Sequence, residues 1–121
     1  SGVLIKDNHL AAIGGDIAMA VSRARGLALS GTAIEVECDT LEQVDAAIAA
    51  GADWVLLDNM SLEQLYEAVA RCRGRVITEA SGGITLDTVR RIAETGVDRI
   101  SVGALTHSAP ALDFGLDFDA L

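Results

Sequence analysis

Acidic and basic side chains follow several short apolar segments of this sequence. In the stretch VLLDNMSLEQL, the apolar residues 55–57 are followed at once by Asp58. Glu37, Glu79 and Lys6 stand in the same place after three other apolar segments. Carboxylates can stabilise positive charge on a reacting group and hold Mg²⁺, and a lysine can bind an anion. We therefore expect these side chains to belong to one functional site, each as the last residue of a strand.

A glycine-rich connection points to a second kind of chemistry. Three positions separate Asp58 from Ser61, which opens the next helical segment, but six separate Glu79 from Thr85. The extra length contains Ser81-Gly82-Gly83, and glycines let backbone N–H groups approach a ligand closely. A helix N-terminus favours anions, so we expect a phosphate site here, with a plain turn as the alternative. A second glycine-bearing loop, which begins at Gly103-Ala104, supports the phosphate interpretation.

An internal repeat identifies the elements that must position these residues. The segments TLEQVDAAIAAGADWVLLD, SLEQLYEAVARCRGRVITE and TLDTVRRIAETGVDRISVG start at Thr40, Ser61 and Thr85. Their apolar residues align at helical spacing, which predicts an amphipathic helix followed by a short strand in each unit. A glutamine three residues after Thr40 and after Ser61 predicts a capping box. Gly51 and Gly96 are expected to end their helices in the left-handed conformation.

The order of the elements predicts an α/β fold with a parallel sheet. Two earlier strands, at residues 3–5 and 34–36, flank a helix from Asp16 to about Ser30. Five strands then alternate with helices at the short period of a (β/α) barrel. A doubly wound sheet is the alternative, although no GxGxxG follows the first strand. A complete barrel needs about 250 residues, so we expect residues 1–121 to be part of a larger TIM-like barrel.

Composition narrows the class of protein. The 121 residues are 50% hydrophobic, which is enough for one domain with a buried core. The net charge of −9 argues against nucleic acid and anionic membranes as partners. No apolar run approaches the roughly 20 residues of a membrane span, and we expect no signal peptide. We expect a cytoplasmic protein whose two cysteines, Cys38 and Cys72, are reduced thiols.

The site residues also have ordinary structural interpretations. Ligands bind at the carboxyl edge of a parallel sheet, and the shared position of Glu37 and Asp58 favours a functional role over helix capping. Lys6 lies in the unusually polar Lys-Asp-Asn-His sequence, although a solvated lysine is the alternative. For Glu79, the alternative is a structural role in which it braces its loop. Glu35 alternates with Glu37 and could point to the same side, or its strand could lie at an edge.

Five segments, taken together, resemble one known family. VLIKDNH, IEVECDTLEQ, VLLDNM, EASGGI and GVDRISVGALTHSAPALDFGLDF occur in an order and spacing similar to those of quinolinate phosphoribosyltransferase, the carboxylating enzyme of NAD biosynthesis. The resemblance covers essentially all 121 residues and is to the C-terminal, α/β-barrel part of that enzyme. It implies transfer of a phosphoribosyl group from phosphoribosyl pyrophosphate to quinolinate. Decarboxylation then gives nicotinate mononucleotide.

The resemblance also implies roles for individual residues. It places Lys6 in contact with the anionic substrates, and Glu37 and Asp58 near the ribose and a Mg²⁺ ion. It further implies a homodimer or a higher homo-oligomer, in which a neighbouring subunit completes the active site. The 5′-phosphate would be held by Ser81, Gly82, Gly83, Gly103, Ala104 and His107.

Residues 1–121 resemble only the C-terminal part of the family's proteins. The family has an N-terminal domain and earlier barrel strands rich in Arg, His and Lys, which grip quinolinate. We therefore expect the 121 residues to be nearly inactive alone. The alternatives are a related phosphoribosyltransferase with another acceptor, a non-catalytic phosphate-binding or assembly module, and an excised half-barrel.

Overall fold

The structure, a computed structural model, describes residues 2–6 and 14–102. None of the described helices is both long and apolar enough to cross a membrane. Strands and helices alternate along the chain in the order β1 (Gly2–Ile5), α1 (Gly14–Leu27), β2 (Ala33–Cys38), α2 (Leu41–Ala50), β3 (Trp54–Asp58), α3 (Leu62–Cys72), β4 (Ile77–Ser81), α4 (Val89–Glu94) and β5 (Arg99–Ile100).

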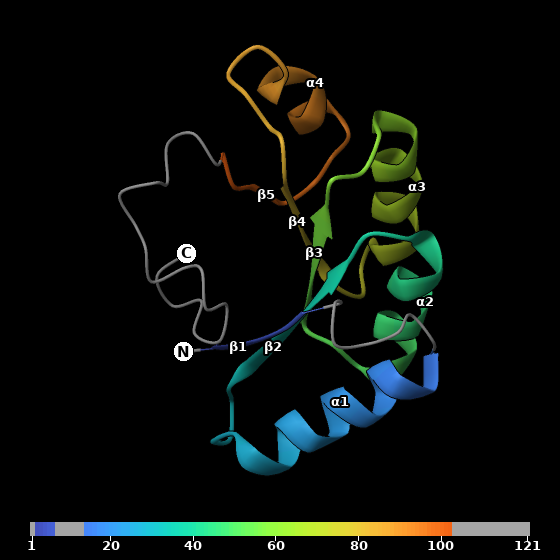
Figure 1. Cartoon of the computed structure of the whole chain (residues 1–121), viewed down its shortest axis with the longest axis vertical. Helices are drawn as coiled ribbons and strands as arrows, with labels where there is room; N and C mark the ends of the chain where they lie inside the picture. Colours follow the sequence, from blue (N-terminus) through green and yellow to red (C-terminus); the bar gives the residue numbers. More distant parts are fainter. Residues whose placement is uncertain (1, 7–13, 103–121) are drawn as a thin grey trace.

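The described strands form one parallel sheet, as the alternation of elements predicts. Its order is β1-β2-β3-β4-β5, so each strand pairs with its neighbours in the sequence. Figure 1 shows α1, α2 and α3 along one side of this sheet. A doubly wound sheet requires a reversal of strand order and helices on both faces. Neither feature occurs in residues 2–6 and 14–102, and the arrangement agrees with part of a (β/α) barrel.

The core lies between the helices and one face of the sheet. Val36, Val55 and Leu57 point to this side and are fully buried, because alternate residues of a strand share a face. Each such side chain contributes about 1.5–3 kcal/mol of hydrophobic stabilisation. The helices cover these strand residues with the buried side chains of Ile17, Val21, Val44, Ala47, Leu65, Ala68 and Ile92.

Two of the three repeats have the helix ends that the sequence predicts. The Gln43 N–H donates to Thr40 Oγ1 at 3.1 Å, and Gln43 Oε1 accepts from the Thr40 N–H at 3.2 Å. Ser61 and Gln64 form the same capping box before α3. Gly51 closes α2 with φ at 83°. These predictions are confirmed, and each cap stabilises its helix by about 1 kcal/mol.

The third repeat departs from the prediction. The helix expected directly after Thr85 begins only at Val89. Thr85 and Thr88 form a turn instead, in which the Thr85 N–H donates to Thr88 Oγ1 and the Thr88 N–H donates to the Thr85 carbonyl, both at 3.1 Å. Leu86 is consequently 70% exposed and not part of a buried helical stripe. Gly96 follows α4 with φ at 93°, in the left-handed conformation expected there.

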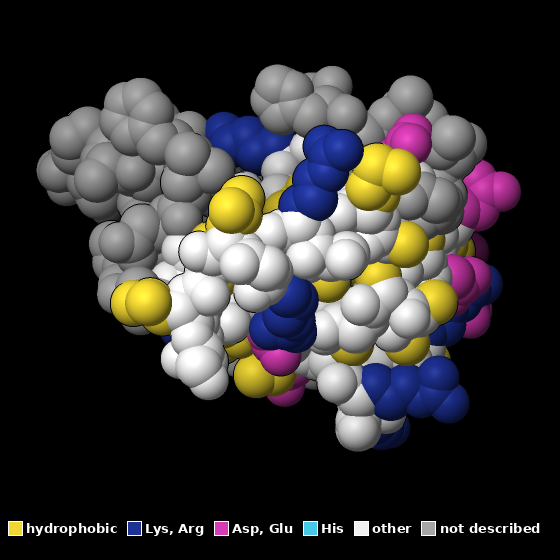
Figure 2. All heavy atoms as spheres, turned by 90° about the horizontal axis from the view of Figure 1, so that it is seen from below, with side chains coloured by type: hydrophobic (Ala, Val, Ile, Leu, Met, Phe, Trp, Pro, Cys, Tyr) yellow, Lys and Arg dark blue, Asp and Glu magenta, His cyan; other side chains and the backbone are white. Residues whose placement is uncertain are grey.

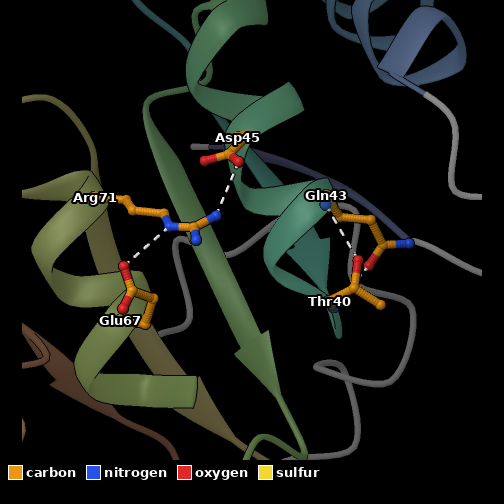
Figure 3. A network of polar contacts seen from close by, with 5 residues as sticks. All are labelled: Thr40, Gln43, Asp45, Glu67 and Arg71. Atoms are coloured by element: carbon orange, nitrogen blue, oxygen red, sulfur yellow. Dashed lines mark hydrogen bonds and ion pairs between the residues drawn. The ribbon is translucent and has the colours of Figure 1, made fainter. Parts of the chain in front are cut away.

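A polar network joins α2 to α3 on the outer surface. Figure 3 shows Arg71 between Asp45 of α2 and Glu67 of its own helix. Arg71 Nη1 lies 2.8 Å from Asp45 Oδ2, and Nε lies 3.3 Å from Glu67 Oε2. The side chains are partly exposed, so the two ion pairs contribute little to stability.

Two aspartates close the amino edge of the sheet in the same way. Asp53 Oδ2 accepts from the Ile34 N–H, and Asp98 Oδ2 accepts from the Thr78 N–H, both at 2.8 Å. Both aspartates come from the Gly-x-Asp of their repeat, so the sequence repeat is also a repeat of hydrogen bonds. Asp53 additionally pairs with Arg25 of α1 at 3.0 Å.

We expect Asp53→Ala and Asp98→Ala each to lower the free energy of unfolding by about 1–3 kcal/mol, because each leaves a strand N–H without its acceptor. Urea unfolding of the chain measures the loss. Asp87→Ala is the control, because Asp87 is exposed in the turn before α4. Equal stability of all three variants would show that these aspartates do not hold the strands.

Candidate functional site

The face of the sheet opposite the helices carries polar side chains in rows. Glu37 lies opposite Leu56, which lies opposite Glu79, and Glu79 lies opposite Arg99. The next row toward the carboxyl edge contains Asp58, opposite Ser81 of β4. The carboxylates identified from the sequence therefore lie on one face, at or near the carboxyl ends of their strands.

The sequence predicted Glu37, Asp58 and Glu79 each as the last residue of a strand, and this prediction is wrong for Glu37 and Glu79. Asp58 is the last residue of β3, but β2 continues to Cys38 and β4 continues to Ser81. Because Glu37 and Glu79 both lie opposite Leu56, Asp58 is one row nearer the carboxyl edge than either. The repeat aligns residues by position in their unit, whereas the register staggers successive strands, as in sheets that curve into barrels.

The loop after β4 folds directly onto the end of β3. Ser81 Oγ donates to Asp58 Oδ1 at 3.1 Å, and the Asn59 N–H donates to the Ser81 carbonyl at 3.0 Å. Gly82 has φ at 83°, and a Cβ there would lie 2.6 Å from Asp58 Oδ1. Only glycine fits, so the backbone of the glycine loop, Ser81–Gly83, is held against the candidate catalytic carboxylate.

The glycine loop also borders a pocket of about 230 Å³ between α3 and α4. Gly82 and Gly83 are exposed and have positive φ, which leaves their backbone accessible. Arg91 of α4 lines the pocket and is exposed. Backbone amides and an arginine near one loop are groups that can bind a phosphate.

Two buried glutamates lie beneath this edge. Glu35 is 0% exposed and Glu79 is 2% exposed. Glu79 Oε2 accepts from the Ser101 hydroxyl. Burial, then the charge of Glu79 and a hydrogen bond between the Glu35 and Glu79 carboxyl groups, raise the pKa of Glu35 to about 9, whereas Arg99 opposes this shift. The alternation of Glu35 with Glu37 was the signal that it points away from the helices.

Trp54 lies on the same face as these glutamates. The guanidinium carbon of Arg99 is 4.6 Å from the centre of the Trp54 ring, which is the geometry of a cation–π contact. The arginine across the sheet, 45 residues later in the chain, carried no local signal for this contact.

The remaining candidates differ in how far the structure describes them. Lys6 directly follows β1 and is partly buried, and both Lys6 and Glu37 take part in polar or electrostatic contacts. The Cys38 thiol is buried and donates to the Val36 carbonyl at 3.6 Å. Gly103, Ala104 and His107 lie outside the described residues.

Glu37 and Asp58 remain the predicted Mg²⁺ ligands. Within the described residues, no group of three or more His, Cys, Asp or Glu side chains could hold a metal ion. Mg²⁺ is commonly bound by one or two carboxylates, with waters and substrate phosphates as its other ligands. Two carboxylates on neighbouring strands beside an accessible glycine loop fit that mode, because substrate phosphates would supply the missing ligands.

Gly82→Ala should destabilise the chain more than Gly74→Ala. Both glycines have φ near 80°, so both variants pay about 1–2 kcal/mol of backbone strain. A Cβ on Gly74 meets nothing within 4 Å, whereas one on Gly82 meets Asp58 and the Asn59 backbone. Urea unfolding measures the difference, and equal losses would mean that the loop does not rest on β3.

Glu35→Gln should flatten the pH dependence of stability. With its pKa raised from 4.5 to about 9, Glu35 holds a proton in the folded state that the unfolded state releases. Stability is therefore full below about pH 4.5 and falls as the pH rises toward 9, by up to about 1.4 kcal/mol per pH unit. Urea midpoints from pH 5 to 9 measure the slope.

The control for this titration is Glu94→Gln, because Glu94 is exposed at the end of α4. We expect it to keep the slope of the parent chain. A parent chain whose stability does not fall between pH 5 and 9 would contradict the raised pKa of Glu35.

A family model and curated relatives match almost the whole of this chain. The family model "Quinolinate phosphoribosyl transferase, C-terminal domain" matches residues 1–117. A nicotinate-nucleotide pyrophosphorylase [carboxylating] of Rattus norvegicus is 44% identical over 117 residues, which cover 94% of this chain and 39% of the rat protein. A probable nicotinate-nucleotide pyrophosphorylase [carboxylating] of Bacillus subtilis is 45% identical, over 96% of this chain and 40% of its own length.

Solved structures agree with the sequence matches. The nicotinate-nucleotide pyrophosphorylase from Francisella tularensis matches with a TM-score of 0.78 and 46% identity, covering 87% of this chain and 36% of that one. A thiamine phosphate pyrophosphorylase from Pyrococcus furiosus matches with a TM-score of 0.65 and 25% identity, covering 85% of this chain and 50% of that one. The chain thus spans about two fifths of the curated relatives it matches. By its sequence and its fold, this chain belongs to the quinolinate phosphoribosyl transferase C-terminal domain family.

Proposed function

We propose that the chain supplies the ribose- and phosphate-binding part of a carboxylating nicotinate-nucleotide pyrophosphorylase. Such an enzyme transfers the phosphoribosyl group of phosphoribosyl pyrophosphate to quinolinate, and decarboxylation gives nicotinate mononucleotide. The observation that carries the proposal is the contact of the glycine loop with Asp58 at the carboxyl edge of the sheet. This contact brings together a carboxylate and an anion-binding backbone. Phosphoribosyl pyrophosphate requires both groups.

The carboxylates act on the ribose. Departure of pyrophosphate leaves positive charge on the ribose carbon, as in glycosyl transfer generally. Fixed negative groups directed at that carbon stabilise the charge without reorganising. Asp58 and Glu37 take this role, and the Ser81 hydroxyl keeps the Asp58 carboxylate oriented. Lys6, on the neighbouring strand end, binds the anionic substrates.

The glycine loop takes the 5′-phosphate. The backbone of Gly82 and Gly83 is exposed, and Arg91 lies at the adjoining pocket. Gly103, Ala104 and His107 would contribute from the next loop. Glu37 and Asp58 would also hold Mg²⁺, which when bound neutralises charge on the pyrophosphate leaving group.

The rest of the active site must come from outside these residues. Among the described residues, the basic side chains of the polar face are Lys6 and Arg99, which are few for a dicarboxylate and a pyrophosphate. We propose that preceding barrel strands pair with the edges at β1 and β5 and supply the quinolinate-binding groups. We further propose a cytoplasmic homodimer or larger homo-oligomer, and near inactivity of the 121 residues alone.

A related transferase with another acceptor is the second candidate. The similarity to a protein named thiamine phosphate pyrophosphorylase favours it, because this part of the fold then occurs with a different activity. The carboxylates and glycine loop described here face the phosphorylated donor in both cases. The acceptor is therefore decided by groups outside the residues that the structure describes.

A chimera tests the proposal. Residues 1–117 replace the matched segment of the Bacillus subtilis relative, and production of nicotinate mononucleotide is measured from phosphoribosyl pyrophosphate and quinolinate. We expect activity in the chimera, and a loss of about 10²-fold or more in kcat for Asp58→Asn, because the variant removes the negative charge that stabilises the positive ribose carbon. Glu94→Gln should leave kcat unchanged.

Three outcomes would count against this assignment. A folded chimera that uses another pyridine carboxylate but not quinolinate would favour the second candidate. Full activity of Asp58→Asn would remove the proposed role of the carboxylate. Quinolinate turnover by the isolated 121 residues, at the rate of the chimera, would contradict the need for the remaining strands.

A further inference from the structure

Asn59 directly follows the candidate catalytic Asp58 and has an unusual backbone conformation. Its φ is 59°, and every other described residue with a positive φ is a glycine. Most side chains rarely adopt this left-handed conformation, whereas asparagine adopts it more readily. The turn ends β3, so Asn59 leaves the sheet and is exposed. None of the ribose and phosphate interactions proposed above involves this residue.

The glycine loop fixes the position of Asn59. The Asn59 N–H donates to the Ser81 carbonyl at 3.0 Å, and a Cβ on Gly82 would lie 2.9 Å from the Asn59 nitrogen. A Cβ on Gly83 would lie 3.8 Å from Asn59 Oδ1, so the side-chain amide lies beside the second glycine. Asn59 and the loop also line the same pocket. The Asn59 side chain is therefore placed between Asp58 and the exposed backbone of the loop.

The side-chain amide of Asn59 has hydrogen-bonding capacity that the described residues leave unused. No hydrogen bond joins this amide to another described residue, whereas the Ser81 hydroxyl is bonded to Asp58. An amide offers two N–H donors and carries no charge. It can donate to a phosphate without neutralising Asp58, as a lysine would, and without repelling the anion, as a second carboxylate would. These properties suit a position beside a carboxylate that must keep its charge.

The side of the molecule at α1 presents its positive charges differently. Figure 2 views the molecule from below and shows lysine and arginine side chains at several separate places, some of them beside acidic ones. Arg25 of α1 pairs with Asp53 at 3.0 Å, so its charge is already compensated in part. Arg91 lines the same pocket as Asn59, and no ion pair joins it to a described residue. An anion at this pocket would therefore meet an uncompensated charge as well as the Asn59 amide.

We propose that Asn59 is a substrate-binding residue whose side-chain amide donates a hydrogen bond to the 5′-phosphate of the ribose donor. This inference rests on the proposed function, which assigns the ribose to Asp58 and the phosphate to the glycine loop. Asn59 lies between these two groups, so a substrate that reaches from one to the other passes its side chain. The left-handed turn then serves to direct the amide toward the phosphate, because a strand that continued past Asp58 would turn the next side chain toward the helices.

Asn59→Gly separates the role of the side chain from that of the backbone. Glycine adopts the left-handed conformation readily, so the turn remains and only the amide is lost. In the chimera with the Bacillus subtilis relative, KM for phosphoribosyl pyrophosphate should rise about tenfold, because one hydrogen bond to a charged group is lost. KM for quinolinate and kcat should stay within about twofold, because the contact is the same before and during the reaction. Glu94→Gln, at an exposed position, should change none of the three constants.

Two further variants test the same contact. Asn59→Asp tolerates the left-handed turn but adds a negative charge, so KM for phosphoribosyl pyrophosphate should rise by about 10²-fold. It decides the question even where the glycine variant does not fold. Asn59→Ala loses both the amide and the favourable backbone, so urea unfolding should show lower stability than for Asn59→Gly. Unchanged KM for phosphoribosyl pyrophosphate in the glycine and aspartate variants would overturn the inference and leave Asn59 as a turn residue only.

Binding without turnover distinguishes this inference from the transfer reaction. Calorimetric titration of the chimera with ribose 5-phosphate, and separately with inorganic pyrophosphate and Mg²⁺, measures the two ends of the donor. We expect Asn59→Gly to weaken the binding of ribose 5-phosphate about tenfold and to leave pyrophosphate binding unchanged. Equal weakening of both ligands or of neither, or no binding of ribose 5-phosphate by the parent chimera, would overturn the inference.

The two proposals can therefore fail separately. A chimera that binds ribose 5-phosphate through Asn59 but forms no nicotinate mononucleotide would contradict the proposed function and leave this contact standing. A chimera that forms nicotinate mononucleotide with the same KM for phosphoribosyl pyrophosphate in Asn59→Gly would contradict the contact and leave the proposed function standing.

Discussion

The parallel register of β3 with its two neighbours decides what every site residue can do. Leu56 lies opposite both Glu37 and Glu79, and Asp58 lies opposite Ser81. A slip of one residue would turn Asp58 toward the helices and bring Leu57 to the polar face. At the opposite edge, Asp53 and Asp98 hold successive strands at fixed positions. The site is therefore positioned by hydrogen bonds at the far end of the same strands.

The two faces of the sheet divide stability from chemistry. The face toward the helices is apolar and buried, whereas the other face gathers carboxylates whose desolvation opposes folding. Glu35 is the extreme case, since its burial raises its pKa to about 9. A chain designed only for stability would replace such a residue with an apolar one. Glu35 lies opposite Trp54, two rows beneath Asp58 on the same face.

The features that the sequence predicts correctly are those determined by residues within about one repeat of the sequence. The capping boxes at Thr40 and Ser61, the left-handed Gly51 and the alternation of strand residues depend on neighbours a few positions away. The stagger that separates Asp58 from Glu37 depends on pairing between strands. It cannot be predicted from the local sequence pattern. The turn at Thr85 was also missed; in it the Thr85 N–H donates to the Thr88 hydroxyl. The family was recognisable from five ordered segments, whereas the buried acidic pair required the fold.

Charge balance connects the candidate site with the proposed assembly. The substrates of the proposed reaction are strongly anionic, but the described polar face holds four carboxyl groups and only two basic side chains. Carboxylates are useful at the ribose, where positive charge develops, and unfavourable where phosphates and quinolinate must bind. The two demands are compatible if the acidic groups and the basic groups come from different parts of one barrel. On this view the chain carries the side of the site that stabilises the transition state. On the same view, the groups that bind the acceptor come from outside the described residues.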